Sequence, residues 1–211
     1  MTDWDYKQFV LDSVKKIMTQ GKSVNLLEWF RQIPQVKIKN YIFHNNGSLR
    51  FDDYSLQWCD EPPSFSNGIA CGDLDNDGDL DMVINNADDE SWILENNLDK
   101  ISPANFLRFQ FFASPQSKKE VFGAIVKLLD EKGKLLQSHR YDPQRSFLST
   151  IEHALHFGVG KMTTIPQVVI SFPSGKQKIL PNVTSSQLLT VFESETNIPA
   201  TKNQNQKLYL L

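Results

Sequence analysis

The spacing of apolar residues changes near residue 38, from a helical to a strand-like period. Before this point apolar side chains recur at intervals of three and four residues, as in Tyr6, Phe9, Val10, Val14 and Ile17. A second apolar segment runs from Leu26 to Ile33 and ends at Pro34, because the residue before a proline avoids helical geometry. The pattern predicts a pair of helices within residues 1–37, which either lies on the β-structure that follows or binds a partner.

Short strand-like runs fill residues 38–100. The runs 41–43 and 49–51 flank Asn45-Asn46-Gly47, a strong turn signal that predicts a β-hairpin. Three further apolar runs, at 68–71, 82–85 and 92–94, predict three more strands. The pair Asn45-Asn46 has a counterpart 51 residues later at Asn96-Asn97, which is a spacing found between the blades of β-propellers.

Residues 101–195 continue with short strands and turns. Apolar runs predict strands at 106–111, 124–128, 135–136, 155–157, 168–172, 178–180 and 188–192. Turn signals separate them, and Gly175 in Pro173-Ser174-Gly175 is expected to form one such structural turn. The chain is therefore predicted to be mainly β, with a small antiparallel β-sandwich or barrel in this part and a polar tail at 196–211.

The composition is that of a globular protein. The chain has 211 residues, of which 40% are hydrophobic and 11% aromatic, enough for a buried core. The net charge of -3, without a basic stripe between aromatic residues, gives nucleic-acid binding little support. No run of about 18 apolar residues occurs, so we expect no membrane span.

Two further features concern the compartment. The segment from Met1 to Tyr6 lacks the basic and apolar parts of a signal peptide, which fits either a cytoplasmic protein or a piece of a longer exported one. The two cysteines, Cys59 and Cys71, are too few for a disulfide framework. They either pair with each other or remain small buried thiols.

The most specific chemistry lies in an acidic stretch at residues 73–81. Its five aspartates alternate along the chain, at Asp73, Asp75, Asp77, Asp79 and Asp81. Side chains at alternate positions of a loop can converge on one point, and oxygen ligands favour a hard cation such as Ca²⁺. We expect carboxylate ligands from Asp73, Asp75, Asp77 and Asp81 and the backbone carbonyl of Asp79, with a sharp turn at Gly78.

This stretch starts like an EF-hand loop but ends differently. The twelfth residue counted from Asp73 is Ile84 instead of glutamate, and a strand begins inside the loop at Leu80. An acidic, solvated turn is the alternative, since Asp, Asn and Gly favour turns by themselves. Five like charges this close repel one another unless a cation lies between them, so the sequence predicts a calcium site in a strand-to-strand turn.

Residues 40–97 resemble an FG-GAP or VCBS repeat, which is one blade of the integrin-α type of β-propeller. The resemblance rests on residues 40–47, on Phe65 to Gly68 and above all on the acidic stretch. It implies Ca²⁺ held by the five aspartates. A closed propeller has typically four to eight blades, whereas this chain has about one, which suggests a fragment or a truncated relative.

Residues 101–195 resemble the ASPIC/UnbV module of cartilage acidic protein relatives and bacterial surface proteins. The matching segments are 123–126, 147–149, 155–160, 172–176 and 182–183. Phe172 stands where the family usually has tryptophan. The resemblance implies an extracellular or periplasmic setting behind a calcium-binding propeller, and it implies no known reaction.

No group of residues predicts catalysis. Glu152, His153 and His156 contain metal-binding side chains, but residues three apart on a strand point to opposite faces. We therefore expect a non-enzymatic, calcium-stabilised recognition or adhesion module of an extracellular or cell-surface protein. Its partner would be a protein or a glycan, and further propeller blades could associate with it.

Two alternatives to this function remain open. The chain could be an accessory or catalytic part of a surface polysaccharide-processing system, with calcium supporting the site. It could also be a gene fragment without a function of its own.

Overall fold

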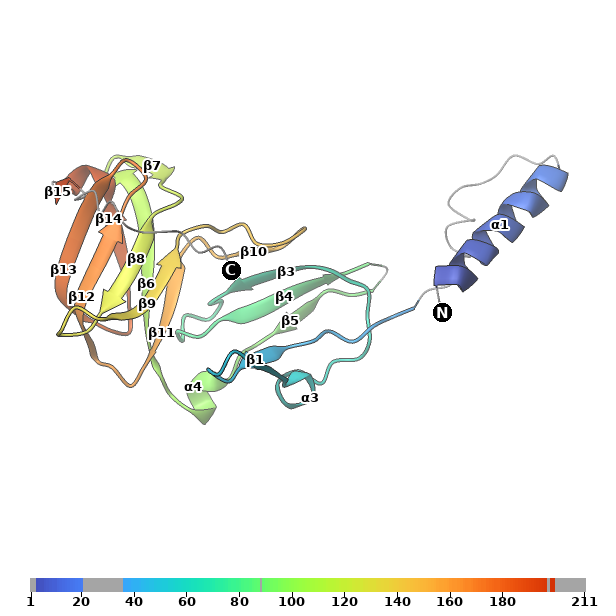
Figure 1. Cartoon of the computed structure of the whole chain (residues 1–211), viewed down its shortest axis with the longest axis horizontal. Coiled ribbons are helices and arrows are strands. Elements are labelled where there is room, and N and C mark those ends of the chain that lie inside the picture. Colours follow the sequence, from blue (N-terminus) through green and yellow to red (C-terminus); the bar gives the residue numbers. More distant parts are fainter. Residues whose placement is uncertain (1–2, 21–35, 88, 197, 200–211) are drawn as a thin grey trace. The chain divides into compact units, whose positions relative to one another are not determined.

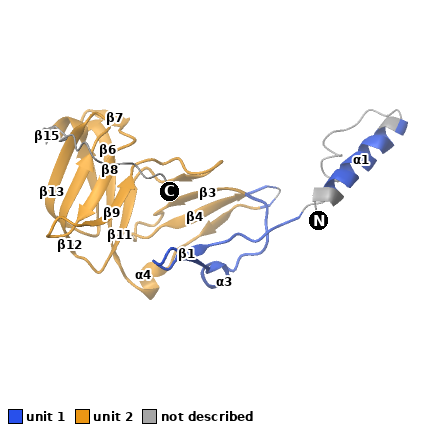
Figure 2. Cartoon of the chain, in the orientation of Figure 1, with its two compact units in different colours: residues 1–66, 86–89 blue, residues 67–85, 90–211 orange. Residues whose placement is uncertain are grey.

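The computed structural model describes residues 3–20, 36–87, 89–196 and 198–199 (Figure 1). The chain divides into two compact units (Figure 2). The first consists of residues 1–66 and 86–89, and the second of residues 67–85 and 90–211. Each unit is described by itself.

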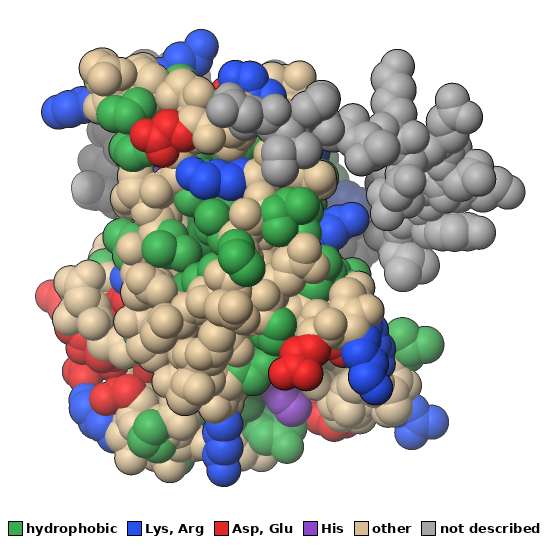
Figure 3. All heavy atoms as spheres, turned by 90° about the vertical axis from the view of Figure 1, so that its left-hand side faces the viewer, with side chains coloured by type: hydrophobic (Ala, Val, Ile, Leu, Met, Phe, Trp, Pro, Cys, Tyr) green, Lys and Arg blue, Asp and Glu red, His purple; other side chains and the backbone are tan. Residues whose placement is uncertain are grey.

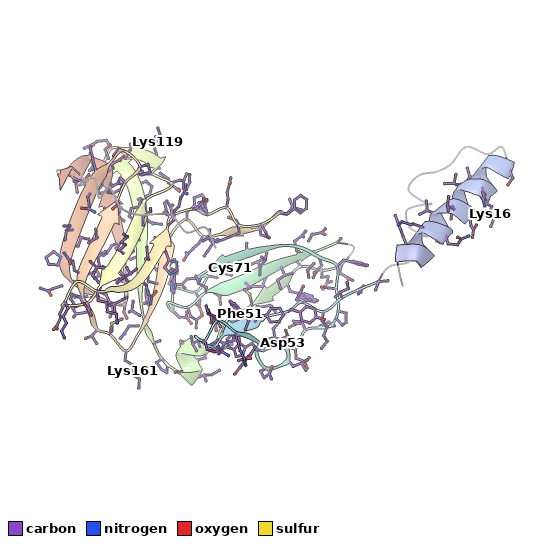
Figure 4. The ribbon with its side chains drawn as sticks, viewed as in Figure 1. Lys16, Phe51, Asp53, Cys71, Lys119 and Lys161 are labelled. Carbon is purple, nitrogen blue, oxygen red and sulfur yellow. The ribbon has the colours of Figure 1, made fainter. Side chains whose placement is uncertain are left out.

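The first unit contains a helix and a small hairpin. The helix α1 (Asp3–Gln20) confirms the first predicted helix, whereas the second, at 26–33, lies outside the described residues. The strands β1 (Phe43–Asn45) and β2 (Phe51–Asp53) pair antiparallel and are followed by the short helix α3 (Ser55–Trp58). Figure 4 marks Phe51 and Asp53 on β2. The predicted hairpin is thus confirmed, with both strands beginning two residues later than expected.

The second unit is built around two sheets that share one core (Figure 1). One sheet has the order β11-β6-β14, with β7 added beside β6, and the other has the order β15-β13-β12-β8-β9. The strands of the first sheet are β6 (Asn105–Ser114), β7 (Ser117–Glu120), β11 (Leu155–Gly160) and β14 (Gln187–Phe192). Those of the second are β8 (Ile125–Leu129), β9 (Leu135–Arg140), β12 (Thr164–Ser171), β13 (Lys176–Thr184) and β15 (Ile198–Pro199).

The pairing of these strands is mostly antiparallel, as the sequence predicts. The exception is β14, which runs parallel to β6, with Leu189 opposite Phe109. The turn between β12 and β13 has Gly175 at φ +86°, and its amide donates to the carbonyl oxygen of Phe172 over 2.9 Å. The predicted strands between residues 106 and 192 are all present.

The core of the sandwich is apolar and drawn from both sheets. It includes Leu107, Phe109 and Phe111 of β6, Phe157 of β11, and Val126, Leu128, Val168 and Ile170 of the facing sheet. The ring of Phe109 stacks on that of Phe111 and meets the edge of Phe157. Because the described strands form two separate sheets without closing on themselves, the module is a sandwich and not a barrel.

A third sheet carries the acidic stretch. Its strands are β3 (Ser66–Gly72), β4 (Asp81–Asn86), β5 (Trp92–Leu94) and β10 (Thr150–Ile151), in the order β10-β3-β4-β5. The short helix α4 (Leu98–Ile101) follows β5 and leads into β6. The strands on both sides of residues 73–81 are as predicted. The fourth strand, β10, was not predicted, and it pairs in parallel with β3 from far along the chain.

Two further sequence-based expectations concern the cysteines and membrane insertion. Cys59 and Cys71 are both free, so the disulfide that the sequence left open is absent, and Figure 4 shows Cys71 on β3.

No helix among the described residues is both long and apolar enough to cross a membrane. Figure 3 shows one face of the molecule, on which acidic, basic and apolar side chains are mixed.

Candidate metal centre

The acidic stretch forms the turn between β3 and β4, which we call the cation loop (residues 73–81). Local hydrogen bonds shape it: the amide of Asp77 donates to Asp75 Oδ1 over 3.3 Å, and the amide of Asp79 donates to Asp77 Oδ1 over 3.0 Å. The chain reverses through left-handed conformations at Asn76 (φ +64°) and Gly78 (φ +97°). These are residue types that tolerate positive φ.

Three of the predicted ligands converge. Asp73, Asp75 and Asp77 each offer a carboxylate oxygen, and these oxygens lie within 4.8 Å of one another. Asp73 is only 8% exposed, and its Oδ1 is buried without a hydrogen-bond partner among the described residues. Carboxylates at this spacing, one of them with an unpaired oxygen, suit a divalent cation with oxygen ligands, as Ca²⁺ requires.

Asp81 lies at the base of the cation loop and ties its ends together. Its Oδ2 accepts a hydrogen bond from the amide of Leu74 (2.9 Å), and its Oδ1 accepts one from the amide of Asn96 (2.8 Å). A carboxylate oxygen has two lone pairs, so these bonds leave room for a metal. Asp81 as the closing ligand, and the Asp79 carbonyl as another, stay predictions.

The side chain of Asp79 faces a residue that the sequence did not reveal. Asp77, Asp79 and Asp99 form a second group of carboxylates with ligand oxygens within 4.8 Å of one another. The amide of Asp99, in α4, donates to Asp79 Oδ2 over 3.1 Å. Asp99 lies 20 residues after Asp79, outside any spacing rule for calcium loops. The sequence offered one signal for Asp99, namely that it is an aspartate two residues after the pair Asn96-Asn97.

A buried arginine joins the cation loop to the sandwich. Arg108 of β6 donates from one terminal nitrogen to Asp73 Oδ2 over 2.6 Å and from the other to Glu152. The side chains of Arg108 and Asp73 are 9% and 0% exposed. Leu107 and Phe109 beside it point into the sandwich core, so Arg108 projects from the opposite face of β6. The sequence did not predict this role for Arg108, because a charged residue in an alternating strand usually faces water.

Gly78 also contacts the sandwich. The Gly78 carbonyl oxygen lies 2.9 Å from His156 Nε2, and the ring of His156 stacks on that of Phe106. A Cβ on Gly78 would lie 2.0 Å from the Phe106 ring, so glycine is required here by space as well as by φ. His153 instead pairs with Glu120, its Nδ1 2.9 Å from Oε1, so the two histidines have separate partners. His156 lies on β11, whereas His153 lies in the bend before it.

The polar atoms of this region share one unusual property. Among the described residues, five buried side-chain nitrogen or oxygen atoms have no hydrogen-bond partner, and all five belong to this centre. They are Asp73 Oδ1, Asp79 Oδ1, Asp99 Oδ1, Arg108 Nε and Glu152 Oε1. Buried polar atoms are normally paired, so such a concentration indicates a site that receives something from outside the chain.

The electrostatics agree with this interpretation. Burial raises the pKa of Asp79 above its usual range, and the charges of Asp77, Asp81 and Asp99 raise it further. Loss of solvent likewise raises the pKa of Asp75, with a contribution from Asp77 and Asp81. Ionising these carboxylates therefore costs free energy in the folded protein, and a bound cation would offset that cost.

A small pocket opens beside the centre. Its volume is about 250 Å³, and its lining includes Leu80, His139, Arg145, Glu152 and His156. Burial lowers the pKa of His139, and electrostatic interaction with Arg145 and His156 lowers it further. The pocket is smaller than the 300–1,000 Å³ of typical ligand sites. It could hold a small polar group.

The comparisons with known proteins concern the sandwich. Residues 114–198 match the model of the family described as ASPIC and UnbV, which supports the resemblance seen in the sequence. No curated protein matches the chain. The propeller repeat expected over residues 40–97 stays a prediction. The match to ASPIC and UnbV suggests a module of the surface or extracellular type.

Proposed function

We propose that this chain is a calcium-stabilised, non-enzymatic recognition or adhesion module of an extracellular or cell-surface protein. The observation that carries the proposal is the convergence of Asp73, Asp75 and Asp77, with a buried, unpaired oxygen on Asp73. Ca²⁺ takes six to eight oxygen ligands, and carboxylates, a backbone carbonyl and water together can supply them. The similarity of residues 114–198 to ASPIC and UnbV supports the surface setting.

The role we propose for the ion is structural. Arg108 already holds one oxygen of Asp73, and His156 lies against the carbonyl of Gly78, so the cation loop is fixed to the sandwich from two sides. A bound Ca²⁺ would fix the remaining carboxylates and offset their mutual repulsion. The ion would thus make the loop and β6 one rigid body, and loops elsewhere would contact a protein or glycan partner.

Thermal unfolding of the full chain with and without Ca²⁺ tests this role. At a hundredfold excess of Ca²⁺ over its dissociation constant, we expect the melting temperature to rise by about 5 to 10 °C. Asp75→Ala and Asp77→Ala should abolish most of the rise. Asp60→Ala is the matched control, because Asp60 is exposed and pairs with Lys39, and both residues belong to the first unit, whereas the cation loop belongs to the second. An unchanged melting temperature in millimolar Ca²⁺ would contradict the proposal.

The pocket beside the centre favours a second candidate, a part in polysaccharide processing. The residues that line it include Asp142, Glu152, His139 and His156, which are residue types used in acid–base catalysis. A screen with surface polysaccharides distinguishes the two functions. Turnover that Glu152→Gln abolishes and Asp60→Asn leaves intact would favour the enzymatic role, and binding without turnover would favour recognition.

A further inference from the structure

We propose that the chain binds a second divalent cation, held by Asp77, Asp79 and Asp99, next to the one proposed at Asp73, Asp75 and Asp77. Asp77 would bridge the two ions. The inference deepens the proposed function and rests on it in one respect, namely that the cation loop binds divalent cations. It adds a ligand, Asp99, that lies outside the loop.

The three carboxylates come from two separate parts of the chain. Asp77 and Asp79 belong to the cation loop, and Asp99 belongs to α4, between β5 and β6. Their ligand oxygens lie within 4.8 Å of one another. Oxygens around a common Ca²⁺ at 2.3–2.6 Å are separated by no more than about twice that bond length, so the spacing fits a shared ion.

A second observation points to a ligand at this place. Asp79 is only 9% exposed, and its Oδ1 is buried and has no hydrogen-bond partner among the described residues. The Oδ1 of Asp99 is buried and unpaired in the same way. The other oxygen of Asp79 accepts the amide of Asp99, a bond that holds the two carboxylates beside each other instead of letting them separate. Two such groups side by side repel, and a cation between them removes the repulsion.

The basic side chains of this region have other partners. Arg108 donates to Asp73 and Glu152. Lys100, which follows Asp99, donates to Glu95 and to Asn97 Oδ1, the latter over 2.6 Å. A cation from solution therefore suits the position between Asp79 and Asp99 better than either side chain does.

The charge balance favours two ions over one. Seven carboxylates take part in the centre: Asp73, Asp75, Asp77, Asp79, Asp81, Asp99 and Glu152. Arg108 offsets one negative charge, which leaves six. One divalent cation would leave four and two would leave two, and the smaller excess is easier to keep at low exposure. Oxygen-only ligands suit hard divalent cations, and among these Ca²⁺ tolerates an irregular ligand arrangement better than Mg²⁺, which demands a near-ideal octahedron.

The experiment counts the ions bound by the full chain. Native mass spectrometry and equilibrium dialysis with Ca²⁺ should give two ions per wild-type chain. Asp99→Asn keeps the shape of the side chain and should leave one ion, and Asp75→Asn should also leave one through loss of the other site. Asp60→Asn, on the exposed side chain of the first unit, should still bind two. Near-ultraviolet circular dichroism checks that each variant is folded.

Each other outcome has a definite meaning. One ion in the wild type overturns the second site whatever the variants do, and leaves the proposed calcium function standing. Two ions in both the wild type and Asp99→Asn overturn the assignment of Asp99. No bound ion in the wild type overturns the proposed function together with this inference. Should Asp99→Asn fail to fold, Asp79→Asn takes its place, and the wild-type count is decisive in any case.

Discussion

The sandwich core and the metal centre share the strand β6 and meet opposite physical requirements on its two faces. On one face Leu107, Phe109 and Phe111 are buried among apolar neighbours from both sheets. On the other face Arg108 is buried among carboxylates. The first face is stabilised by the chain alone, since apolar burial needs no partner outside it. The metal centre at the second face contains the five buried polar atoms that have no hydrogen-bond partner among the described residues.

This difference indicates what the proposed cation would contribute to the fold. Packing of apolar side chains stabilises the sandwich. The metal centre, by contrast, has the geometry of a site that a cation from solution would complete. Stability measurements with and without Ca²⁺ can therefore separate the two faces. Substitutions on the core face should act equally in both conditions, and substitutions on the charged face should not.

The largest effect is expected from Phe109→Ala in the core. Phe109 is fully buried and contacts the rings of Phe111 and Phe157, so the substitution leaves a cavity and should cost about 3–5 kcal/mol. Urea unfolding measures the loss, which should be the same with and without Ca²⁺. Phe147→Ala, at an 82% exposed position, is the control and should change stability by less than about 0.5 kcal/mol. A Phe109→Ala loss that depends on Ca²⁺ would show that the two faces are not separable.

The next effect is expected from Arg108→Met on the charged face. Without Ca²⁺ the substitution leaves Asp73 and Glu152 buried and uncompensated, which should cost about 3 kcal/mol. With millimolar Ca²⁺ the loss should shrink, because the ion supplies positive charge beside Asp73. Lys119→Met, at an exposed position on β7 (Figure 4), should be nearly neutral in both conditions. Equal losses of Arg108→Met in both conditions would be evidence against a cation at Asp73.

A smaller effect is expected from Gly78→Ala. The new Cβ would collide with the ring of Phe106 and would also strain a residue at φ +97°, for a cost of about 2 kcal/mol. Gly133→Ala is the matched control, because Gly133 has φ +77° with open space around it and should lose only about 1 kcal/mol. Ca²⁺ affinity, measured by calorimetry, should fall for Gly78→Ala alone. Similar losses of stability and unchanged affinity in both variants would refute a close approach of the loop to β6.

The smallest effect is expected from pH at His139. Its pKa is lowered by burial and by Arg145 and His156, so the folded state disfavours the charged form. The stability that this neutral form contributes is present above the ordinary histidine pKa of about 6.5 and is lost as the pH falls below it. Between pH 7.5 and 5.5 the wild type should lose at most about 0.5 kcal/mol more than His139→Gln, since His139 is exposed and solvent screens its charge. If the urea midpoints of the wild type and His139→Gln fall by the same amount between pH 7.5 and 5.5, a lowered pKa of His139 is contradicted.

Much of the fold follows from local patterns in the sequence. The alternation at residues 106–111 and 168–172 and the turn at Gly175 lead directly to strands and to a hairpin. Pairing between distant strands does not follow. The parallel pairs β14 with β6 and β10 with β3 join segments far apart in the chain, and no local spacing of residues encodes them.

The residues of the candidate site also fall into two groups, those that local sequence predicts and those that only the fold brings together. Asp73, Asp75 and Asp77 could be predicted because they lie in one short loop with a recognised spacing. Asp99, Arg108 and Glu152 could not, because they reach the loop only through the fold. Arg108 was hidden further by its strand, since alternation alone assigns a charged residue to the solvent face.

The contact between Gly78 and His156 has a consequence for the order of synthesis. The two residues are 78 positions apart, so at 5–20 residues per second the cation loop leaves the ribosome about 4 to 16 seconds before the histidine does. Arg108 is made in the first half of that interval, whereas β10 and the start of β11 are made only at its end, so for most of it the loop has no sandwich to lie against. We expect a nascent chain that stops before residue 150 to bind Ca²⁺ weakly. Tight binding of the ion would then mark the moment at which the sandwich has closed.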